Sequence, residues 1–424
     1  MSKINSIRAI QVLDSRGVPT VATKISLENG ISASAMVPSG ASTGSKEALE
    51  LRDGGTAYSG KSVENAVSNV NTVIAQALKG FDVNNQSDID HKMIEIDATS
   101  DKSNLGANAI LSVSLASAHL AANYQEKNLH DYFNKSFNEI TGLNIDQSLP
   151  MPMLNILNGG EHADNNIDIQ EFMIIPKGSS SIKQALQWSS EIYWKLKEIL
   201  KDKGLSTSVG DEGGFAPNLK SNEEAIQFIL TAIEACKLKP GEDISLALDC
   251  AASEFYKDGK YNLSGESRTL DNVEFTNYLS ELIQKYPIIS IEDGMDEMDY
   301  SGWNNLTKQI GKDCQLVGDD LFVTNKKILK EGISKGLANS ILIKFNQIGT
   351  LTETYETIKV ADENNYKSII SHRSGETEDT TLSDLAVGLG SGQIKTGAPC
   401  RSDRVAKYNR LLWIENSCPD IKIG

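Results

Sequence analysis

The pattern of hydrophobic and polar positions changes near residue 149 of the chain. Beyond that point, short apolar runs end in a polar or charged residue and are followed by a Gly-containing loop and a helix-like pattern. Six such runs cover 244–249, 288–292, 315–319, 340–344, 367–372 and 393–395. Their apolar positions do not alternate with polar ones, which is typical of strands buried on both faces of a parallel sheet. After the first interval the runs end about every 23 to 28 residues, one strand–helix unit of a barrel. We therefore predict an α/β fold with a (β/α)8 TIM-like barrel over residues 149–424.

The first part of the chain mixes strand-like and helix-like patterns without a repeating unit. Residues 7–13 and 21–27 are predicted strands on either side of a turn-rich segment. Helix-like patterns follow at 63–78 and in the Ala-rich run after Asn104. These features predict an N-terminal α+β domain over residues 1–135, and the polar stretch 136–148 is interpreted as a linker.

Charge and composition narrow the class of partner. A net charge of −16 argues against nucleic acid or an anionic membrane as the main partner, whereas local cations or metal ions still permit an anionic substrate.

The five cysteines are dispersed without a CxxC spacing, as is typical of reduced thiols in a cytosolic protein. The first residues lack the apolar stretch of a signal peptide. The weakly polar segment 105–123 is predicted to be a helix packed in a core and not a membrane span. We expect a cytoplasmic protein; a secondary surface or secreted pool is compatible with the sequence.

Three of the predicted strands end on carboxylates, namely Asp249, Glu292 and Asp319. The C-terminal ends of barrel strands meet at one mouth, so these side chains would form an all-oxygen site. Such a site favours Mg²⁺ or Mn²⁺ over zinc. Any one of these carboxylates alone is more often solvated or paired with a Lys or Arg. Three together cannot crowd at one mouth without a cation.

Two further strands end on Lys344 and Lys395. A lysine close to a metal ion and another cation should have a lowered pKa, which suits a base near neutral pH. A salt bridge to the carboxylate cluster is the alternative for either lysine. His372, Arg373 and Ser374 follow the intervening strand. An arginine fork plus a hydroxyl suits a phosphate, and an ordinary surface loop is the alternative.

Earlier loops add Glu171, Glu212 and His162. A carboxyl group held among other carboxylates can keep its proton and serve as a general acid, and a turn-stabilising role is the alternative. His162 taken alone is more often an ordinary loop histidine than a ligand. The loop 39–44 is not a Walker A motif, because no Gly-Lys-Ser/Thr completes it. We interpret it as a mobile lid that supplies a hydroxyl or carbonyl ligand.

Taken together, these segments resemble the enolase family, in the family's order and across essentially the whole chain. The resemblance is carried by SGASTG (39–44), QEFMI (170–174), GDEGGFAP (210–217), ALDCAASEF (247–255), SIEDGM (290–295), VGDDLFVTN (317–325), LIKFNQIGT (342–350), SHRSGETED (371–379) and QIKTGAPCRSDRVAKYN (393–409). It implies an α+β capping domain on a modified (β/α)8 barrel, in agreement with the hydrophobic pattern. It also implies a glycolytic and gluconeogenic lyase (a hydro-lyase, phosphopyruvate hydratase) that uses Mg²⁺ to dehydrate 2-phospho-D-glycerate reversibly to phosphoenolpyruvate.

The metal ligands follow from the resemblance position by position. Asp249, Glu292 and Asp319 are implied to hold a first Mg²⁺, which binds the substrate carboxylate. Ser42 is implied to ligate a second Mg²⁺ when the loop 39–44 closes. Mn²⁺ is a possible substitute.

The resemblance also implies the catalytic roles. Lys344 would remove the C2 proton, and Lys395 together with the metal ions would stabilise the resulting dianion. Glu212 would donate a proton to the departing C3 hydroxyl, with Glu171 and His162 assisting. Substrate contacts are implied for Gln170, His372, Arg373 and Ser374.

At two positions associated with the family's dimer interface, this chain has a different residue from the usual one. The family usually reads DSRGNPTVE and LLRIE, where this chain reads DSRGVPTVA (14–22) and LLWIE (411–415). Ala22 and Trp413 thus replace a Glu and an Arg that are associated in the family with a salt bridge across the dimer interface. Exposed ion pairs contribute little and burying an indole contributes more, so we expect a homodimer or homo-octamer to persist.

Two alternative functions share much of this pattern. A muconate cycloisomerase or a racemase would have the same barrel and carboxylates, but those enzymes usually carry a Lys-x-Lys pair on an early strand, and the corresponding region has none. A non-catalytic enolase-fold scaffold or surface-binding protein is the second alternative. Such proteins normally lose a ligand or the base, whereas every position is intact in this sequence.

Overall fold

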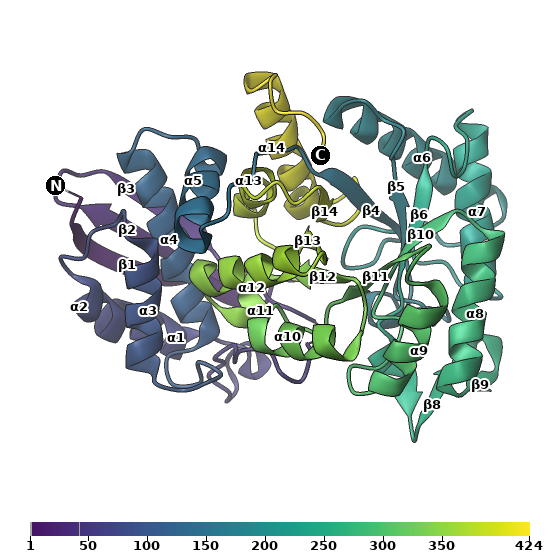
Figure 1. Ribbon diagram of the computed structural model, residues 1–424, viewed down its shortest axis with the longest axis horizontal. Coiled ribbons are helices and arrows are strands. Elements are labelled where there is room, and N and C mark those ends of the chain that lie inside the picture. The colour runs from purple at the N-terminus through teal and green to yellow at the C-terminus, as the bar shows by residue number, and fades with distance from the viewer. Residues whose placement is uncertain (1, 42) are drawn as a thin grey trace.

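The chain folds into an N-terminal α+β unit beside a closed barrel (Figure 1). The computed structural model describes residues 2–41 and 43–424. In the N-terminal unit, β1 (Ile4–Leu13), β2 (Pro19–Leu27) and β3 (Ser32–Met36) form a three-stranded antiparallel sheet. The tight turn 14–17 joins β1 to β2, as the sequence predicts. The helices of this unit are α1 (Glu64–Asn69), α2 (Ala75–Leu78), α3 (Gln86–Asp97), α4 (Ala107–Tyr124) and α5 (Leu129–Thr141).

Helix α4 is the centre of the N-terminal unit. It packs against β2 and β3 on one side and against α3 and α5 on others. Nearly all of its residues are buried, which explains the weakly polar composition of this segment. The prediction of a core helix at 105–123 is therefore confirmed. Among the described residues, no helix combines the length and the apolar character needed to cross a bilayer.

Eight strands close the barrel in the order β10-β11-β12-β13-β14-β4-β5-β6. Their bounds are β4 (Met151–Asn158), β5 (Glu171–Ile175), β6 (Ser245–Asp249), β10 (Ile288–Glu292), β11 (Gln315–Gly318), β12 (Ser340–Ile343), β13 (Lys367–Ser371) and β14 (Gln393–Lys395). All six barrel strands predicted from the sequence are present. A second, internal cluster of buried side chains, which includes Met153, Met173 and Leu342, fills the space inside the barrel.

One strand of the barrel departs from the regular parallel arrangement. Strand β5 runs antiparallel to both β4 and β6, and no α-helix separates β4 from β5. An antiparallel strand starts where its neighbours end, and Glu171, the first residue of β5, pairs in register with Asp249, the last residue of β6. The reversal therefore brings Glu171 and the preceding loop to the rim where the other strands end. The fold is a modified TIM barrel.

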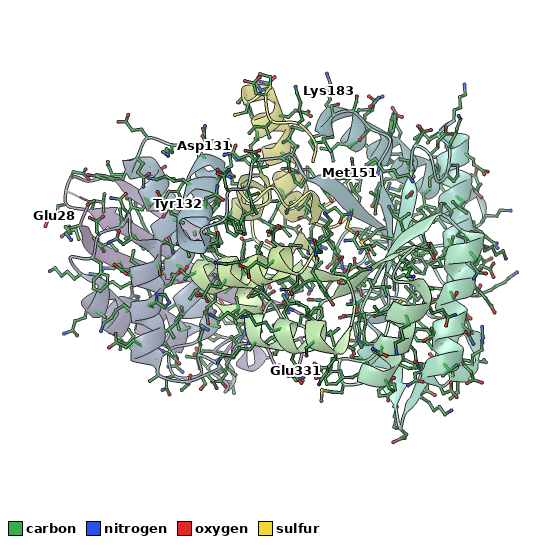
Figure 2. The ribbon with its side chains drawn as sticks, in the orientation of Figure 1. Glu28, Asp131, Tyr132, Met151, Lys183 and Glu331 are labelled. Carbon is green, nitrogen blue, oxygen red and sulfur yellow. The ribbon has the colours of Figure 1, made fainter. Side chains whose placement is uncertain are left out.

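Helices cover the outside of the barrel. They are α6 (Ile182–Asp202), α7 (Asn222–Ala235), α8 (Asn272–Lys285), α9 (Tyr300–Ile310), α10 (Lys326–Lys335), α11 (Phe345–Ile348), α12 (Leu351–Glu363), α13 (Thr381–Gly388) and α14 (Ser402–Ser417). A small antiparallel sheet of β7 (Tyr256–Lys257), β8 (Lys260–Leu263) and β9 (Arg268–Leu270) is inserted after β6. This insertion explains why the first interval of the strand pattern is longer than the others. Charged side chains such as Glu28 and Glu331 project from the periphery (Figure 2).

Helix α12 joins the two units. It packs against α3, α4 and α5 of the N-terminal unit (Figure 1). Asp90 of α3 accepts hydrogen bonds from the backbone N (3.0 Å) and the Oγ1 (2.7 Å) of Thr352, in the first turn of α12. Ser114 of α4 accepts a third bond, from the Leu351 N. The N-terminal unit thus satisfies backbone donors that would otherwise lack partners at the start of a buried helix.

The predicted end of the N-terminal domain at residue 135 falls inside a helix. Helix α5, whose first turn carries Asp131 and Tyr132 (Figure 2), runs from Leu129 to Thr141 and so continues past residue 135. The division into residues 1–135, a linker at 136–148 and a barrel at 149–424 stays a proposal.

Candidate active site

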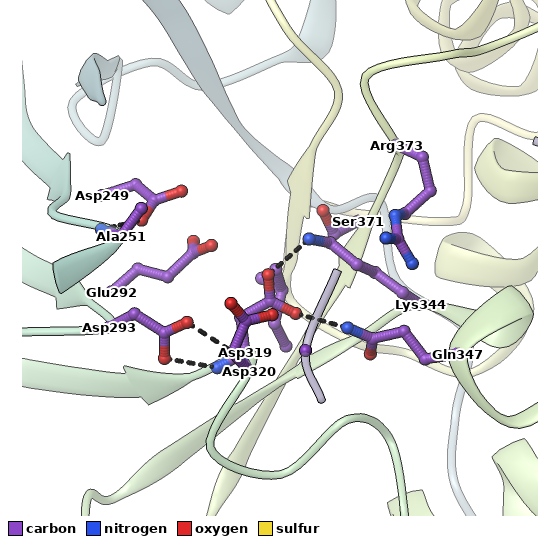
Figure 3. Close-up of polar contacts among 12 residues, drawn as sticks. Asp249, Ala251, Glu292, Asp293, Asp319, Asp320, Lys344, Gln347, Ser371 and Arg373 are labelled. Carbon is purple, nitrogen blue, oxygen red and sulfur yellow. Dashed lines mark hydrogen bonds and ion pairs between the residues drawn. The ribbon is translucent and has the colours of Figure 1, made fainter. Parts of the chain in front are cut away.

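The polar residues that end the barrel strands lie together at one mouth (Figure 3). Asp249 and Glu292 are the last residues of β6 and β10, and Lys395 is the last residue of β14. Asp319 and Lys344 directly follow β11 and β12. Each is buried or nearly so, although each carries a charge in water. Ionised groups are found in such surroundings only when other charges or hydrogen bonds compensate for the lost water.

Lys395 lies at the centre of one carboxylate group. Its Nζ is 3.0 Å from Asp249 Oδ2, 2.9 Å from both Glu292 oxygens and 3.2 Å from Glu171 Oε2. All four side chains are at least nine-tenths buried. One ammonium group thus connects the ends of β6, β10 and β14 with the start of β5.

Lys344 belongs to a second group, centred on Asp319. Its Nζ donates to Asp319 Oδ2, and Gln347 Nε2 donates to the other oxygen, Oδ1, at 2.9 Å (Figure 3). The guanidinium of Arg373 lies on the same side of the mouth as Lys344 in Figure 3. Asp319 is therefore held on both of its carboxylate oxygens.

The sequence predicts a lowered pKa for a lysine beside a metal ion and another cation, whereas the protein groups around both lysines shift the pKa in the opposite direction. Burial by itself lowers the pKa of Lys344, but the Asp319 carboxylate outweighs burial and raises that pKa above its ordinary value. Burial acts in the same way on Lys395, and the surrounding carboxylates, Asp249 first, raise its pKa well above the ordinary value. An amine held by carboxylates keeps its proton because the neighbours stabilise the positive charge.

His162, Glu171 and Glu212 form a third group. His162 Nδ1 lies 3.4 Å from Glu171 Oε1 and 3.8 Å from Glu212 Oε1. Burial, followed by repulsion from Glu212, raises the pKa of Glu171 well above its ordinary value. A raised pKa favours the protonated form, which is the direction that the sequence predicts for a carboxyl group among other carboxylates.

Glu212 has different surroundings. Its Oε2 accepts a hydrogen bond from Asn155 Nδ2 (3.2 Å) and lies 3.2 Å from His372 Nε2. Burial alone would raise the pKa of Glu212, but His372 and the other donors hold it well below the ordinary value. Burial lowers the pKa of His372 to about 3, so its ring is neutral. Arg404 NH1 donates to Nδ1 of that ring at 2.5 Å, which leaves the ring hydrogen on Nε2, facing Glu212.

The segment after β13 lies against the loop 39–44. Arg373 pairs with Glu47, just beyond that loop, with NH1 to Oε2 at 2.9 Å and NH2 to Oε1 at 3.1 Å. Ser374 Oγ accepts the backbone N–H of Ala41 at 2.7 Å. The predicted metal ligand Ser42 lies outside the described residues. The predicted substrate contact Gln170 is buried beside Glu171 and donates its backbone N–H to Asp249 O at 3.1 Å.

Comparison with protein families gives two consecutive matches. Residues 4–133 match the enolase N-terminal domain, and residues 146–422 match the enolase C-terminal TIM barrel domain. The two matches together cover nearly the whole chain.

The chain belongs to the enolase family.

Enolase-family enzymes are lyases that act on small molecules and generally use Mg²⁺. The residues at this mouth fit such an ion. Carboxylate oxygens of Asp293, Asp319 and Asp320 lie within 4.8 Å of one another, and hard divalent cations prefer oxygen ligands. Of the three predicted ligands, this group contains Asp319, whereas Asp249 and Glu292 lie beside it on Lys395. Burial, followed by repulsion between neighbouring carboxylates, raises the pKa of Glu292, Asp293 and Asp320 well above their ordinary values. A bound cation would remove this repulsion.

Two further aspartates at this barrel mouth, Asp293 and Asp320, are not predicted from the sequence. Both Asp293 carboxylate oxygens accept backbone N–H groups at 2.9 Å, one from Asp319 and one from Asp320 (Figure 3). Asp293 has a φ of +40°, a strained conformation for a residue with a side chain. The sequence does hold a signal for them. Each directly follows a predicted metal ligand, in Glu292-Asp293 and Asp319-Asp320.

The free space at this mouth is small. The cavity lined by the catalytic candidates has a volume of about 20 Å³, room for about one water molecule. A much larger cavity, of about 1240 Å³, lies at the opposite end of the barrel, where β4, β11 and β14 begin. None of the clustered carboxylates lines that larger cavity, so the smaller cavity is the candidate active site.

Proposed function

We propose that the chain is a phosphopyruvate hydratase, the enolase that reversibly dehydrates 2-phospho-D-glycerate to phosphoenolpyruvate in glycolysis and gluconeogenesis. One observation supports this reaction above all. Strand β12, which precedes Lys344, and strand β5, which begins with Glu171, are four positions apart in the closed ring of eight strands. The candidate base therefore enters the mouth from one wall. Glu171, which lies beside the candidate acid Glu212 and His162, enters from the opposite wall. An anti elimination needs this arrangement, because the proton and the hydroxyl leave from opposite faces of the substrate.

Proton removal is assigned to Lys344. The C2 proton of 2-phosphoglycerate is weakly acidic because the carbanion forms beside an ionised carboxylate. Two Mg²⁺ ions, when bound, would neutralise the carboxylate cluster and stabilise the negative charge that develops on the substrate. With Asp319 engaged by a cation, Lys344 loses the partner that raises its pKa and can accept a proton. Lys395, held between Asp249, Glu171 and Glu292, presents a fixed positive charge to the same substrate carboxylate.

Loss of the hydroxyl is assigned to the opposite wall. Glu212 donates a proton to the departing C3 hydroxyl, assisted by His162 and by Glu171, which has the raised pKa of the two glutamates. His372 and Asn155 hold Glu212 in position for this step. The reverse hydration uses the same groups, with the carboxylate accepting a proton from water.

Substrate and metal binding are assigned to the remaining residues. Gln170 and His372 contact the substrate, and Arg373 and Ser374 form the phosphate site, where a guanidinium fork matches two phosphate oxygens. Asp249, Glu292 and Asp319 are the proposed ligands of the first Mg²⁺, and Ser42 of the second, with Mn²⁺ as a substitute. The dispersed cysteines, which are typical of reduced thiols, support a cytoplasmic location.

The proposed reaction creates an enol double bond that absorbs ultraviolet light. With 2-phosphoglycerate and Mg²⁺, absorbance should rise to an equilibrium value, and it should fall when the reaction starts from phosphoenolpyruvate. A chelator should stop both changes, and added Mg²⁺ or Mn²⁺ should restore them. A folded chain that gives no absorbance change with excess Mg²⁺ would be a non-catalytic scaffold.

We also propose that the chain is a homodimer. Ile10, Leu13 and Trp413 expose 63%, 53% and 66% of their surfaces, although large apolar side chains are usually buried. Ala22 pairs with Ile10 in the β1–β2 register, on the sheet that the family's dimer interface would use. Sedimentation at micromolar concentration should show a dimer or an octamer, and Trp413→Ala should shift it toward monomer. A wild-type chain that sediments only as a monomer would contradict the proposal.

A further inference from the structure

Glu47 is an ion-pair partner of Arg373, the arginine of the proposed phosphate site. Its two carboxylate oxygens receive NH1 and NH2 of Arg373 at 2.9 and 3.1 Å, one oxygen to each nitrogen. Only 10% of the Glu47 side chain and 3% of the Arg373 side chain are exposed. Carboxylate and phosphate are the two anions that match this planar fork. Glu47 thus uses the donors that a substrate phosphate would need.

The same carboxylate contacts two further parts of the site. Glu47 Oε1 accepts the backbone N–H of Gly44, the last residue of the loop 39–44, at 3.1 Å. It also accepts from Gln347 Nε2 at 3.3 Å, and that nitrogen donates to Asp319 Oδ1 at 2.9 Å. A movement of Glu47 therefore changes the hydrogen bonding of the loop end and of the amide that holds Asp319.

The small volume of the mouth means that some side chain must move. A cavity of about 20 Å³ holds about one water molecule, and a phosphate group is several times larger. Arg373 lines this cavity. A buried guanidinium is costly without an anionic partner, so one anion has to replace another on Arg373.

We propose that Glu47 is an internal counterion that a substrate phosphate must displace from Arg373, a positioning and specificity-determining residue for the proposed reaction. This inference rests on the proposed function, because it assumes that Arg373 binds phosphate. Displacement sets a threshold that a dianionic phosphate passes and a weaker anion does not. It also frees the Gly44 amide and one contact of Gln347, which links phosphate binding to the loop 39–44 and to Asp319.

Binding of inorganic phosphate to three proteins tests the inference. Calorimetry with saturating Mg²⁺ compares wild type, Glu47→Gln and the control Glu64→Gln. Glu64 is an exposed glutamate in the first turn of α1. Because Glu47→Gln removes the competing charge, it should bind phosphate about tenfold tighter, and its KM for 2-phosphoglycerate should fall. Glu64→Gln should stay within about twofold of wild type. A merely structural role predicts weaker binding, not tighter.

A measurement on the wild type keeps the test valid if Glu47→Gln fails to fold. Phosphate should speed hydrogen exchange of the Gly44 amide, because its acceptor leaves, by about fivefold or more. Unchanged or weaker phosphate binding by folded Glu47→Gln, an equal effect of Glu64→Gln, or unchanged Gly44 exchange would each overturn the inference. If the wild type converts 2-phosphoglycerate normally, such a result overturns the role of Glu47 alone. A wild type without turnover overturns the proposed function and this inference together.

Discussion

Lys344→Ala should reduce exchange of the C2 proton of 2-phosphoglycerate by on the order of 10⁴-fold, to the background rate. Lys344 is the only base assigned to the wall beside β12, and alanine leaves no group there that can accept the proton. The measurement is the loss of the C2–H signal in proton NMR, with enzyme, 2-phosphoglycerate and Mg²⁺ in deuterated water. Phosphoenolpyruvate formation should fall with it.

The variant keeps the groups assigned to the metal ion. Asp319 retains its hydrogen bond from Gln347, so Mg²⁺ binding measured by calorimetry should survive. Lys335→Ala is the matched control, because this lysine pairs with Glu331 on the outer surface of α10 and should leave exchange unchanged. Exchange that persists in Lys344→Ala would show that another group is the base.

Glu212→Gln should separate the two halves of the reaction. The amide keeps the size of the side chain and still accepts the hydrogen bond from Asn155, but it cannot give a proton to the leaving hydroxyl. We expect phosphoenolpyruvate formation to fall by about 10²–10⁴-fold while C2 exchange continues. The first value comes from enol absorbance and the second from the NMR exchange assay.

Two results would contradict the assignment of Glu212. Unchanged dehydration would move the acid role to Glu171, which has the raised pKa of the pair. Equal loss of exchange and dehydration would mean that the substitution disturbs binding or the carboxylate cluster as a whole. Glu161→Gln is the control, since Glu161 is exposed on the loop that carries His162.

The barrel strands could be predicted because each is an uninterrupted apolar run that ends in a polar residue. Strands β10 and β14 were predicted with the bounds that the structure has, and the other four differ by one residue at one end. A parallel strand buried on both faces must be apolar throughout, and its polar end marks the barrel mouth. The direction of β5 was not predictable in this way, because its apolar residues 172–175 look the same in either direction. Its reversal is what puts Glu171 at the mouth.

The parts of the site that the sequence did not reveal depend on contacts between distant segments. Glu47 meets Arg373 across more than 300 residues of chain, and nothing in the local pattern marks Glu47 as part of the site. The pKa of Lys344 depends on whether a carboxylate lies against it, which follows from the packing of β11 beside β12. Likewise, α1 and α2 are parts of the predicted helix at 63–78, which contains a π-helical turn at Val70–Ile74 that its apolar pattern does not show.

The most direct test of the central claim is a crystal structure of the chain with Mg²⁺ and 2-phosphoglycerate bound. We predict that C2 of the substrate lies within reach of Lys344 Nζ, and that the C3 hydroxyl faces Glu212 on the opposite wall. The phosphate should lie on Arg373, with the Glu47 carboxylate displaced. A substrate that presents C2 and the C3 hydroxyl to the same wall, or that binds away from this mouth, would contradict the account.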